Sequence, residues 1–390
     1  MPPSRRRALA LAAAAGLALA VLPLAAGPAG ADEATGPIGG QLMGAPGVVV
    51  APGVHPPPDV AASWLVADMD SGLIYGAKAP HTLLRPASTL KTLTALVLLP
   101  LLKPATVYTA TLADTQMQGT RVGMVAGATY TVDELFRAML LPSANDATHA
   151  LETIAGGTGR TVALMAAEAR HLQADDTTIK DPSGLDQRGQ FSSAYDLALF
   201  GRAAMAMPAF CAYVVVPRST FPGRMPKKPG AARASFAIQS LNRLLLEGYP
   251  GIIGVKTGYT SQAGNTFIGA ATRSGHTLLV VLMHTKGNAD VAERRLLNWA
   301  FDNYGRAAPV GELVGPAAPV SESASAATLS QVRPPAAAGT PAGSSASLLG
   351  WLAAVAAAGA LAVAGGAVVR SSRRRRRRGS PLGLAPLRRR

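Results

Sequence analysis

Three short segments contain residue types that could together carry out nucleophilic catalysis. They are Ser88-Thr89-Leu90-Lys91, Ser143-Ala144-Asn145 and Lys256-Thr257-Gly258. A serine hydroxyl is a weak nucleophile until a base removes its proton. A lysine three residues further along a helix lies on the same face, within reach of that hydroxyl. Ser88 and Lys91 are therefore a candidate nucleophile and base.

A lysine acts as a base only if its pKa is lowered. Burial in a dry cleft beside a second cation, for which Lys256 is the candidate, would lower the pKa of Lys91. The alternative is that Ser88 only caps a helix and that Lys91 is solvated. The occurrence of all three segments in this order favours catalysis.

The histidines suggest no competing mechanism. They are scattered, without metal-ligand spacing and without a pairing typical of a Ser-His-Asp triad: His55, His81, His149, His171, His276 and His284. We therefore expect no metal and no cofactor. His149 and His284 are interpreted as structural, and Asp146 and Asp181 as residues that cap or turn the chain.

The elements that must position these residues are strands near both ends of the folded part and helices that lie mainly between them. Residues 63–67 and 73–77 predict strands joined by a turn at Asp70-Ser71-Gly72, and residues 252–256, 266–271 and 278–284 predict three more. Helices are expected at 88–102, 132–141, 146–155, 161–172, 194–206 and 289–303. This order predicts an α+β domain in which helices flank an antiparallel sheet and form a mostly helical subdomain.

Charge is concentrated at the two ends. The chain has 37 Lys and Arg against 22 Asp and Glu, a net charge of +15. Thirteen of the basic residues are Arg5–Arg7 and the arginines from 370 onwards, so the rest carries about +2. A nucleic-acid-binding protein would spread its basic residues over a folded face, so we expect no nucleic-acid partner.

Both ends of the chain predict that the folded part between them lies outside the cytoplasm. Residues 1–31 have the charged start, apolar run and Ala-Gly-Ala site of a secretory signal peptide, although an uncleaved anchor is an alternative. Residues 347–369 are uncharged and long enough to span a membrane, and the basic segment 370–390 follows, which predicts a cytoplasmic C-terminus. Between the signal peptide and the membrane span we expect a flexible leader at 32–59, a catalytic domain at 60–305 and an Ala/Pro/Ser-rich linker at 306–346.

The three motifs resemble those of serine DD-peptidases and active-site serine β-lactamases, and their surroundings are most similar to D-alanyl-D-alanine carboxypeptidases. The resemblance rests on RPASTLKT at 85–92, MLLPSANDA at 139–147 and GVKTGYT at 254–260. Residues 181–185 and 195–198 also resemble the connecting region of that family.

This resemblance implies a role for each motif residue. Ser88 would attack the penultimate D-Ala carbonyl of a peptidoglycan stem pentapeptide, Lys91 would take its proton, and Ser143 would relay a proton to the leaving amine. The expected substrate contacts are Asn145 to the stem backbone and Lys256 and Thr257 to the terminal carboxylate, with Gly258 allowing close approach. The backbone N–H groups of Ser88 and Tyr259 would form the oxyanion hole.

The same resemblance implies partners and several rival functions. The expected partners are stem peptides ending in D-Ala-D-Ala, with β-lactams as covalent inhibitors. A serine β-lactamase is one rival, but the common class needs a loop glutamate for deacylation, which the sequence does not offer, and reads Ser-Asp-Asn in place of Ser143-Ala144-Asn145. A non-catalytic peptidoglycan-binding homologue is a second rival, and a transpeptidase that uses the same acyl-enzyme is a third.

Overall fold

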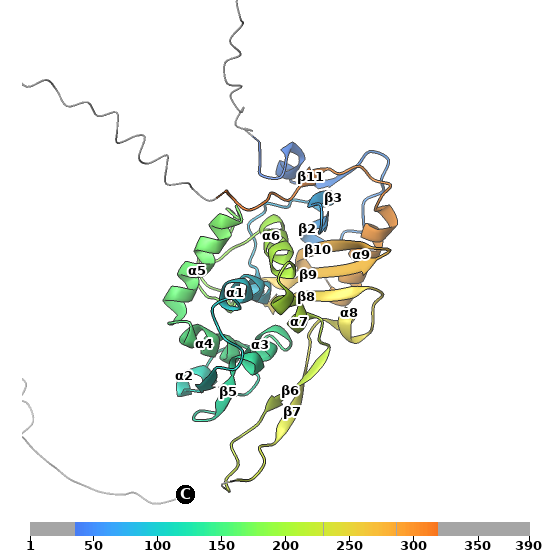
Figure 1. Ribbon diagram of the computed structural model, residues 1–390. Coiled ribbons are helices and arrows are strands. Elements are labelled where there is room, and N and C mark those ends of the chain that lie inside the picture. Colours follow the sequence, from blue (N-terminus) through green and yellow to red (C-terminus); the bar gives the residue numbers. More distant parts are fainter. Residues whose placement is uncertain (1–35, 229, 286, 319–390) are drawn as a thin grey trace, which may run out of the picture. The chain divides into compact units, whose positions relative to one another are not determined.

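The computed structural model describes residues 36–228, 230–285 and 287–318. Within them a seven-stranded antiparallel sheet has the order β1-β3-β2-β10-β9-β8, with β11 paired to β3 (Figure 1). The strands are β1 (Val48–Val50), β2 (Ala61–Asp68), β3 (Leu73–Lys78), β8 (Ile252–Thr260), β9 (Gly264–Arg273), β10 (His276–Thr285) and β11 (Gly311–Glu312). Strands from the start and the end of the folded part thus form one sheet.

Alternation along the central strands gives the sheet two buried faces. On β2, Leu65 belongs to the core that includes α6 (Ala194–Met205), and Val66 belongs to the core that includes α9 (Ala289–Asn303). Successive side chains of a strand point to opposite faces, which explains this division. The strand that carries Lys256-Thr257-Gly258, β8, lies at one edge of the sheet and is therefore open on one side.

A helical part packs beside the sheet (Figure 1). Its elements are η2 (Ala87–Leu90), α1 (Lys91–Leu98), α2 (Leu112–Thr115), α3 (Val132–Leu140), α4 (Asn145–Ile154) and α5 (Thr158–His171), with the short strands β4 (Val107–Thr109) and β5 (Thr129–Thr131). Helix α3 begins where the Thr131 side chain accepts from the backbone N–H of Glu134, while the Glu134 carboxylate accepts from that of Thr131.

The α+β prediction with an antiparallel sheet and helices is confirmed, and most elements lie close to their expected positions. The helix predicted at 88–102 is instead a 3-10 turn, η2, followed by α1, which ends at Leu98. Elements that the sequence analysis missed are η1 (Gln41–Gly44), α2, α7 (Pro208–Val214), α8 (Arg243–Leu246), β1, β4, β5, β11 and the hairpin of β6 (Arg218–Pro222) and β7 (Ser235–Gln239).

The packed part is longer than residues 60–305. The leader predicted to be flexible at 32–59 packs from residue 36 onwards, because β1 pairs with β3 and Met43 is 1% exposed. The linker predicted from 306 begins later, because β11 pairs with β3 and Leu313 is also 1% exposed. Backbone pairing to the sheet edge compensates for the scarcity of large apolar residues in both segments.

The predicted signal peptide, transmembrane helix and basic tail lie outside the described residues. Among the helices that are described, none alone combines the length and the apolar composition needed to cross a membrane, and only the bent pair α6 and α7 meets that test when taken together.

Candidate active site

Ser88 and Lys91 lie at the junction of η2 and α1. The Lys91 Nζ is 3.0 Å from the Ser88 Oγ, 2.7 Å from the Asn145 Oδ1 and 2.6 Å from the Ser183 carbonyl oxygen. The last two atoms can only accept hydrogen bonds. A neutral amine has two N–H groups and one lone pair, so these acceptors hold both N–H groups and leave the lone pair for the Ser88 hydroxyl.

The environment of Lys91 favours the neutral amine. Its side chain is completely buried, and this burial lowers the pKa of Lys91 to about 7, although the carboxylates of Asp181 and Glu152 act in the opposite direction. We expected burial beside a second cation, Lys256, to lower it. Burial lowers the pKa of Lys91, and the repulsion between the two amines lowers the pKa of Lys256.

Lys256 is a residue of β8, the strand that faces the cleft, but its side chain is buried. It is 1% exposed, and its Nζ donates to the carbonyl oxygen of Thr257 at 2.9 Å. Burial first, and then the neighbouring Lys91, lower the pKa of Lys256 well below its ordinary value. An anionic group bound at Thr257 would raise that pKa again, so Lys256 can respond to a carboxylate without lining the cleft.

Ser143 lies in the turn before α4, and Asn145 is the first residue of that helix. The Ser143 Oγ is buried and has no hydrogen-bond partner within the described residues, and its backbone has a φ of 63°. A non-glycine residue in this region is uncommon and often marks a functional site. The Asn145 Nδ2 donates to the Gln118 carbonyl oxygen at 2.7 Å, which leaves its second N–H for another acceptor.

Two glycines allow the segments around Ser88 to approach closely. A Cβ added at Gly258 would lie 2.8 Å from the Ser88 backbone nitrogen, so β8 passes directly beside the turn that carries the nucleophile. A Cβ at Gly184 would lie 2.0 Å from the Ala87 carbonyl oxygen. The segment at 181–185 is therefore packed against the same turn and supplies the Ser183 carbonyl that holds Lys91.

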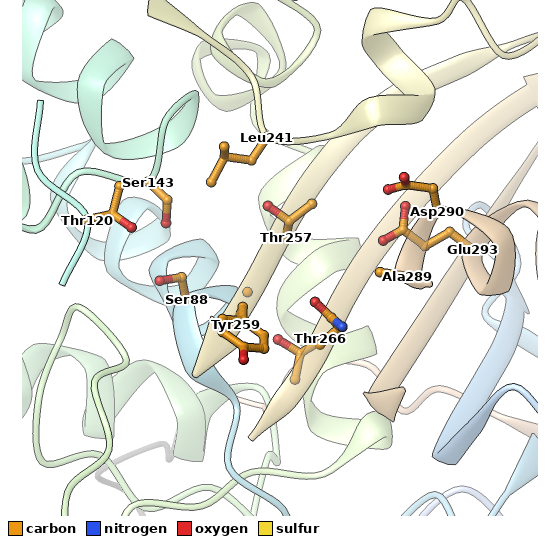
Figure 2. A pocket seen from close by; sticks show the side chains of 12 residues that line it. Ser88, Thr120, Ser143, Leu241, Thr257, Tyr259, Thr266, Ala289, Asp290 and Glu293 are labelled. Carbon is orange, nitrogen blue, oxygen red and sulfur yellow. The ribbon is translucent and has the colours of Figure 1, made fainter. Parts of the chain in front are cut away.

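Two cavities meet at Ser88. The first, shown in Figure 2, is also lined by Ser143, Thr257, Gly258 and Tyr259. The second lies beside it and is lined by Asn145, by Tyr259 and Thr260 of β8, and by residues of two loops: Gln118, Gly119, Thr120, Gly184, Leu185, Asp186 and Gln187. The structure thus brings together at one opening Ser88, Ser143, Asn145, Thr257, Gly258 and Tyr259, whereas Lys91 and Lys256 lie buried behind it.

The cleft also contains residues that the sequence analysis did not single out. Leu241 lies at the edge of the first cavity, and Asp290 and Glu293 of α9 lie at its far side from Ser88 (Figure 2). Glu152 is buried near Lys91, and burial raises its pKa to about 7. No motif or spacing in the sequence marks these residues, although Glu152 lies in the same helix as Asn145.

Asp146 and His149, two of the residues interpreted as structural, hold neighbouring segments in place. The Asp146 carboxylate accepts hydrogen bonds from the backbone N–H groups of Val122, Gly123 and Met124, and the His149 ring contacts Asp114 at 2.6 Å. Within the described part of the chain, no three His, Cys, Asp or Glu side chains converge in a way that could hold a metal ion.

Comparison with known sequences gives a consistent result. The family profile described as D-alanyl-D-alanine carboxypeptidase matches residues 51–287. D-alanyl-D-alanine carboxypeptidase DacB2 of Mycobacterium tuberculosis is 40% identical over 235 residues, which cover 60% of this chain and 78% of the relative. DacF of Bacillus subtilis is 27% identical over 252 residues, which cover 63% of each chain.

Solved structures share the fold. A D-alanyl-D-alanine carboxypeptidase from Mycobacterium tuberculosis superimposes with a TM-score of 0.63 and 37% identity, covering 68% of this chain and all of that chain. A Streptomyces DD-transpeptidase superimposes with a TM-score of 0.59 and 23% identity, covering 65% of this chain, and indicates the fold alone.

Proposed function

The chain belongs to the D-alanyl-D-alanine carboxypeptidase family, and we propose that it removes the terminal D-alanine from peptidoglycan stem pentapeptides through an acyl-enzyme on Ser88. The observation that carries this proposal is that the Lys91 Nζ lies within hydrogen-bond distance of the Ser88 Oγ and of two atoms that can only accept, which in the neutral amine leaves the lone pair for the Ser88 hydroxyl. The family relationship supports a serine-type hydrolase that β-lactams acylate.

The first step is attack by Ser88. Its Oγ adds to the carbonyl carbon of the penultimate D-Ala while its proton moves to the neutral Nζ of Lys91. The backbone N–H groups of Ser88 and Tyr259 are proposed to receive the developing oxyanion. The close approach of Gly258 to the turn that carries Ser88 supports this placement.

The second step releases the terminal D-alanine. The C–N bond breaks, and the departing amine takes up a proton that passes from Lys91 through the Ser143 hydroxyl. The unpartnered Ser143 Oγ in the cavity supports this role. Water then hydrolyses the ester, which returns the Ser88 hydroxyl and releases the shortened stem peptide.

The third part of the proposal concerns the terminal carboxylate. Thr257 lines the cavity and would donate its hydroxyl to the carboxylate, while the buried side chain of Lys256 would contribute positive charge. The Asn145 Nδ2 retains one N–H that can donate to the stem backbone. These contacts select a substrate with a free carboxyl end.

The test is release of D-alanine from a diacyl-D-Ala-D-Ala peptide. We expect release by the full chain, none by Ser88→Ala, and unchanged release by Ser235→Ala, which alters an exposed serine of β7. Rapid turnover of penicillin without release of D-alanine would contradict the proposal and favour a β-lactamase. Binding of stem peptides without either reaction would favour a non-catalytic peptidoglycan-binding protein.

We also propose that the enzyme acts outside the cytoplasm and is anchored by a single span at 347–369. The signal-like residues 1–31 and the basic segment 370–390 support this orientation. Removal of residues 347–390 should release the enzyme from the membrane fraction. Retention of the shortened chain in that fraction would contradict the anchor.

A further inference from the structure

The hairpin of β6 and β7 projects away from the body of the protein (Figure 1). Its five residue pairs run from Arg218 opposite Gln239 to Pro222 opposite Ser235, and the connecting loop extends beyond them. On the loop side of the last pair, Arg233 donates to the carbonyl oxygens of Gly223 and Thr129 and lies over the Tyr130 ring. The middle of the hairpin is thus held against β5 of the helical part.

The sequence that forms the hairpin is strongly basic. Residues 203–246 contain no Asp or Glu, but six Lys and Arg: Arg218, Arg224, Lys227, Lys228, Arg233 and Arg243. The side chains of Arg218, Arg224, Lys227 and Lys228 are exposed and make no ion pair within the described residues. Unpaired cations on one projecting element create a local positive potential.

A groove connects this basic hairpin with the catalytic cleft. It is lined by Arg218 and Gln239 of the hairpin and, just beyond it, by Ser240, Leu241, Arg243, Leu246 and Glu247, whose carboxylate is paired with Arg243 and Arg294. Leu241 also lines the cavity that contains Ser88 and Thr257. The cleft and the groove therefore adjoin at Leu241, so a polymer in the cleft can continue into the groove at the base of the hairpin.

We propose that the β6–β7 hairpin and this groove bind a second, non-scissile stretch of peptidoglycan through the free carboxylates of its stem peptides. The inference rests on the proposed function, because the polymer that continues from the cleft must be the substrate itself. Each stem peptide that is not cross-linked ends in a carboxylate, so the polymer presents repeated negative charges to the exposed lysines and arginines. Direct continuity at Leu241 favours this polymer over a lipid surface.

The experiment compares a polymeric and a short substrate. D-alanine release by the full chain is measured on peptidoglycan sacculi stripped of phosphate polymers and on a diacyl-D-Ala-D-Ala peptide, which is too short to reach the hairpin. The test variant carries Arg224→Glu, Lys227→Glu and Lys228→Glu. The control carries Arg160→Glu, Arg170→Glu and Arg306→Glu, an equal charge change at exposed residues of α5 and after α9.

At low salt, we expect the test variant to release D-alanine from sacculi about tenfold or more slowly than the wild type does. The loss should shrink as salt rises, because exposed charges are screened. Activity on the short peptide should stay unchanged, and the control should match the wild type on both substrates. When Ser88→Ala is added to the wild type, the control and the test variant, the test variant should co-sediment least with sacculi, and the other two should co-sediment equally. This measurement tests the hairpin separately from catalysis.

Several results would overturn the inference. Equal activity of the test variant and the wild type on sacculi would do so, as would an equal loss in the control. Loss on both substrates would mean that the hairpin shapes the cleft and does not bind the polymer. Binding only to unstripped sacculi, or to anionic phospholipid vesicles but not to sacculi, would assign the hairpin to a phosphate-bearing partner. If the wild type released no D-alanine from either substrate, the proposed function would fail, and co-sedimentation would still decide on the hairpin.

Discussion

The burial of Lys91 makes a quantitative prediction about how acylation depends on pH. With the pKa of Lys91 lowered to about 7, from an ordinary value of 10.5, about half of this lysine is neutral at pH 7. A solvated lysine would be neutral in only about 3 molecules per 10,000 at that pH. The lowered pKa therefore raises the population of the active base by roughly a thousandfold.

The neutral fraction also fixes the direction of the pH dependence. Because the neutral amine is the base, the acylation rate should fall about tenfold per pH unit well below pH 7 and reach a plateau above it. Lys91→Arg should abolish the plateau, because a guanidinium keeps its proton throughout the range, and the expected loss is about 1,000-fold. Lys103→Arg, at an exposed position, should leave the profile unchanged.

The assay is the maximal acylation rate by a fluorescent penicillin at saturating concentration between pH 5 and 9. Saturation removes the effect of Lys256 on carboxylate binding from the measured constant. A flat profile, or a rise centred near pH 10, would refute the assignment of Lys91 as the base. So would a Lys91→Arg enzyme that retains the wild-type rate.

Two further substitutions test the cleft. Ser143→Ala should slow release of D-alanine by about 100-fold with little loss of thermal stability, because the Ser143 Oγ has no hydrogen-bond partner to lose; an undiminished rate would remove Ser143 from the proton path. Gly258→Ala should destabilise the fold by about 1–3 kcal/mol and prevent penicillin labelling. The reason is that the added Cβ would lie 2.4 Å from the Thr266 Oγ1 and 2.8 Å from the Ser88 nitrogen. Unfolding curves and labelling like those of the wild type would show that β8 can move away from η2.

The sequence predicts the elements that have a clear local signal. Helix α9 begins after the Asn288 cap and matches its predicted bounds of 289–303, and the strands of the central sheet follow runs of apolar residues. The β6–β7 hairpin was missed because most of its residues are exposed, so no alternation of apolar and polar side chains marks it. The pairing of β1 with β3 depends on backbone contacts between distant segments, which composition does not report.

The same limit applies to the site. The motif residues Ser88, Ser143 and Thr257 could be identified from residue types and order, and the structure gathers them around one cavity. The acceptors of the Lys91 amine could not be predicted, because the Ser183 carbonyl is a backbone atom 92 residues away in the chain. Burial was expected to lower the pKa of Lys91, but the complete burial of this side chain emerges only when the helical part packs against β8.

The most direct test of the central claim is the mass of the covalent adduct. The full chain is incubated with a penicillin, digested, and analysed by mass spectrometry to locate the acyl group. We predict one adduct, on the peptide that contains Ser88, which disappears in Ser88→Ala and persists in Ser235→Ala. An adduct on another residue, or unchanged labelling of Ser88→Ala, would contradict the assignment of Ser88 as the nucleophile.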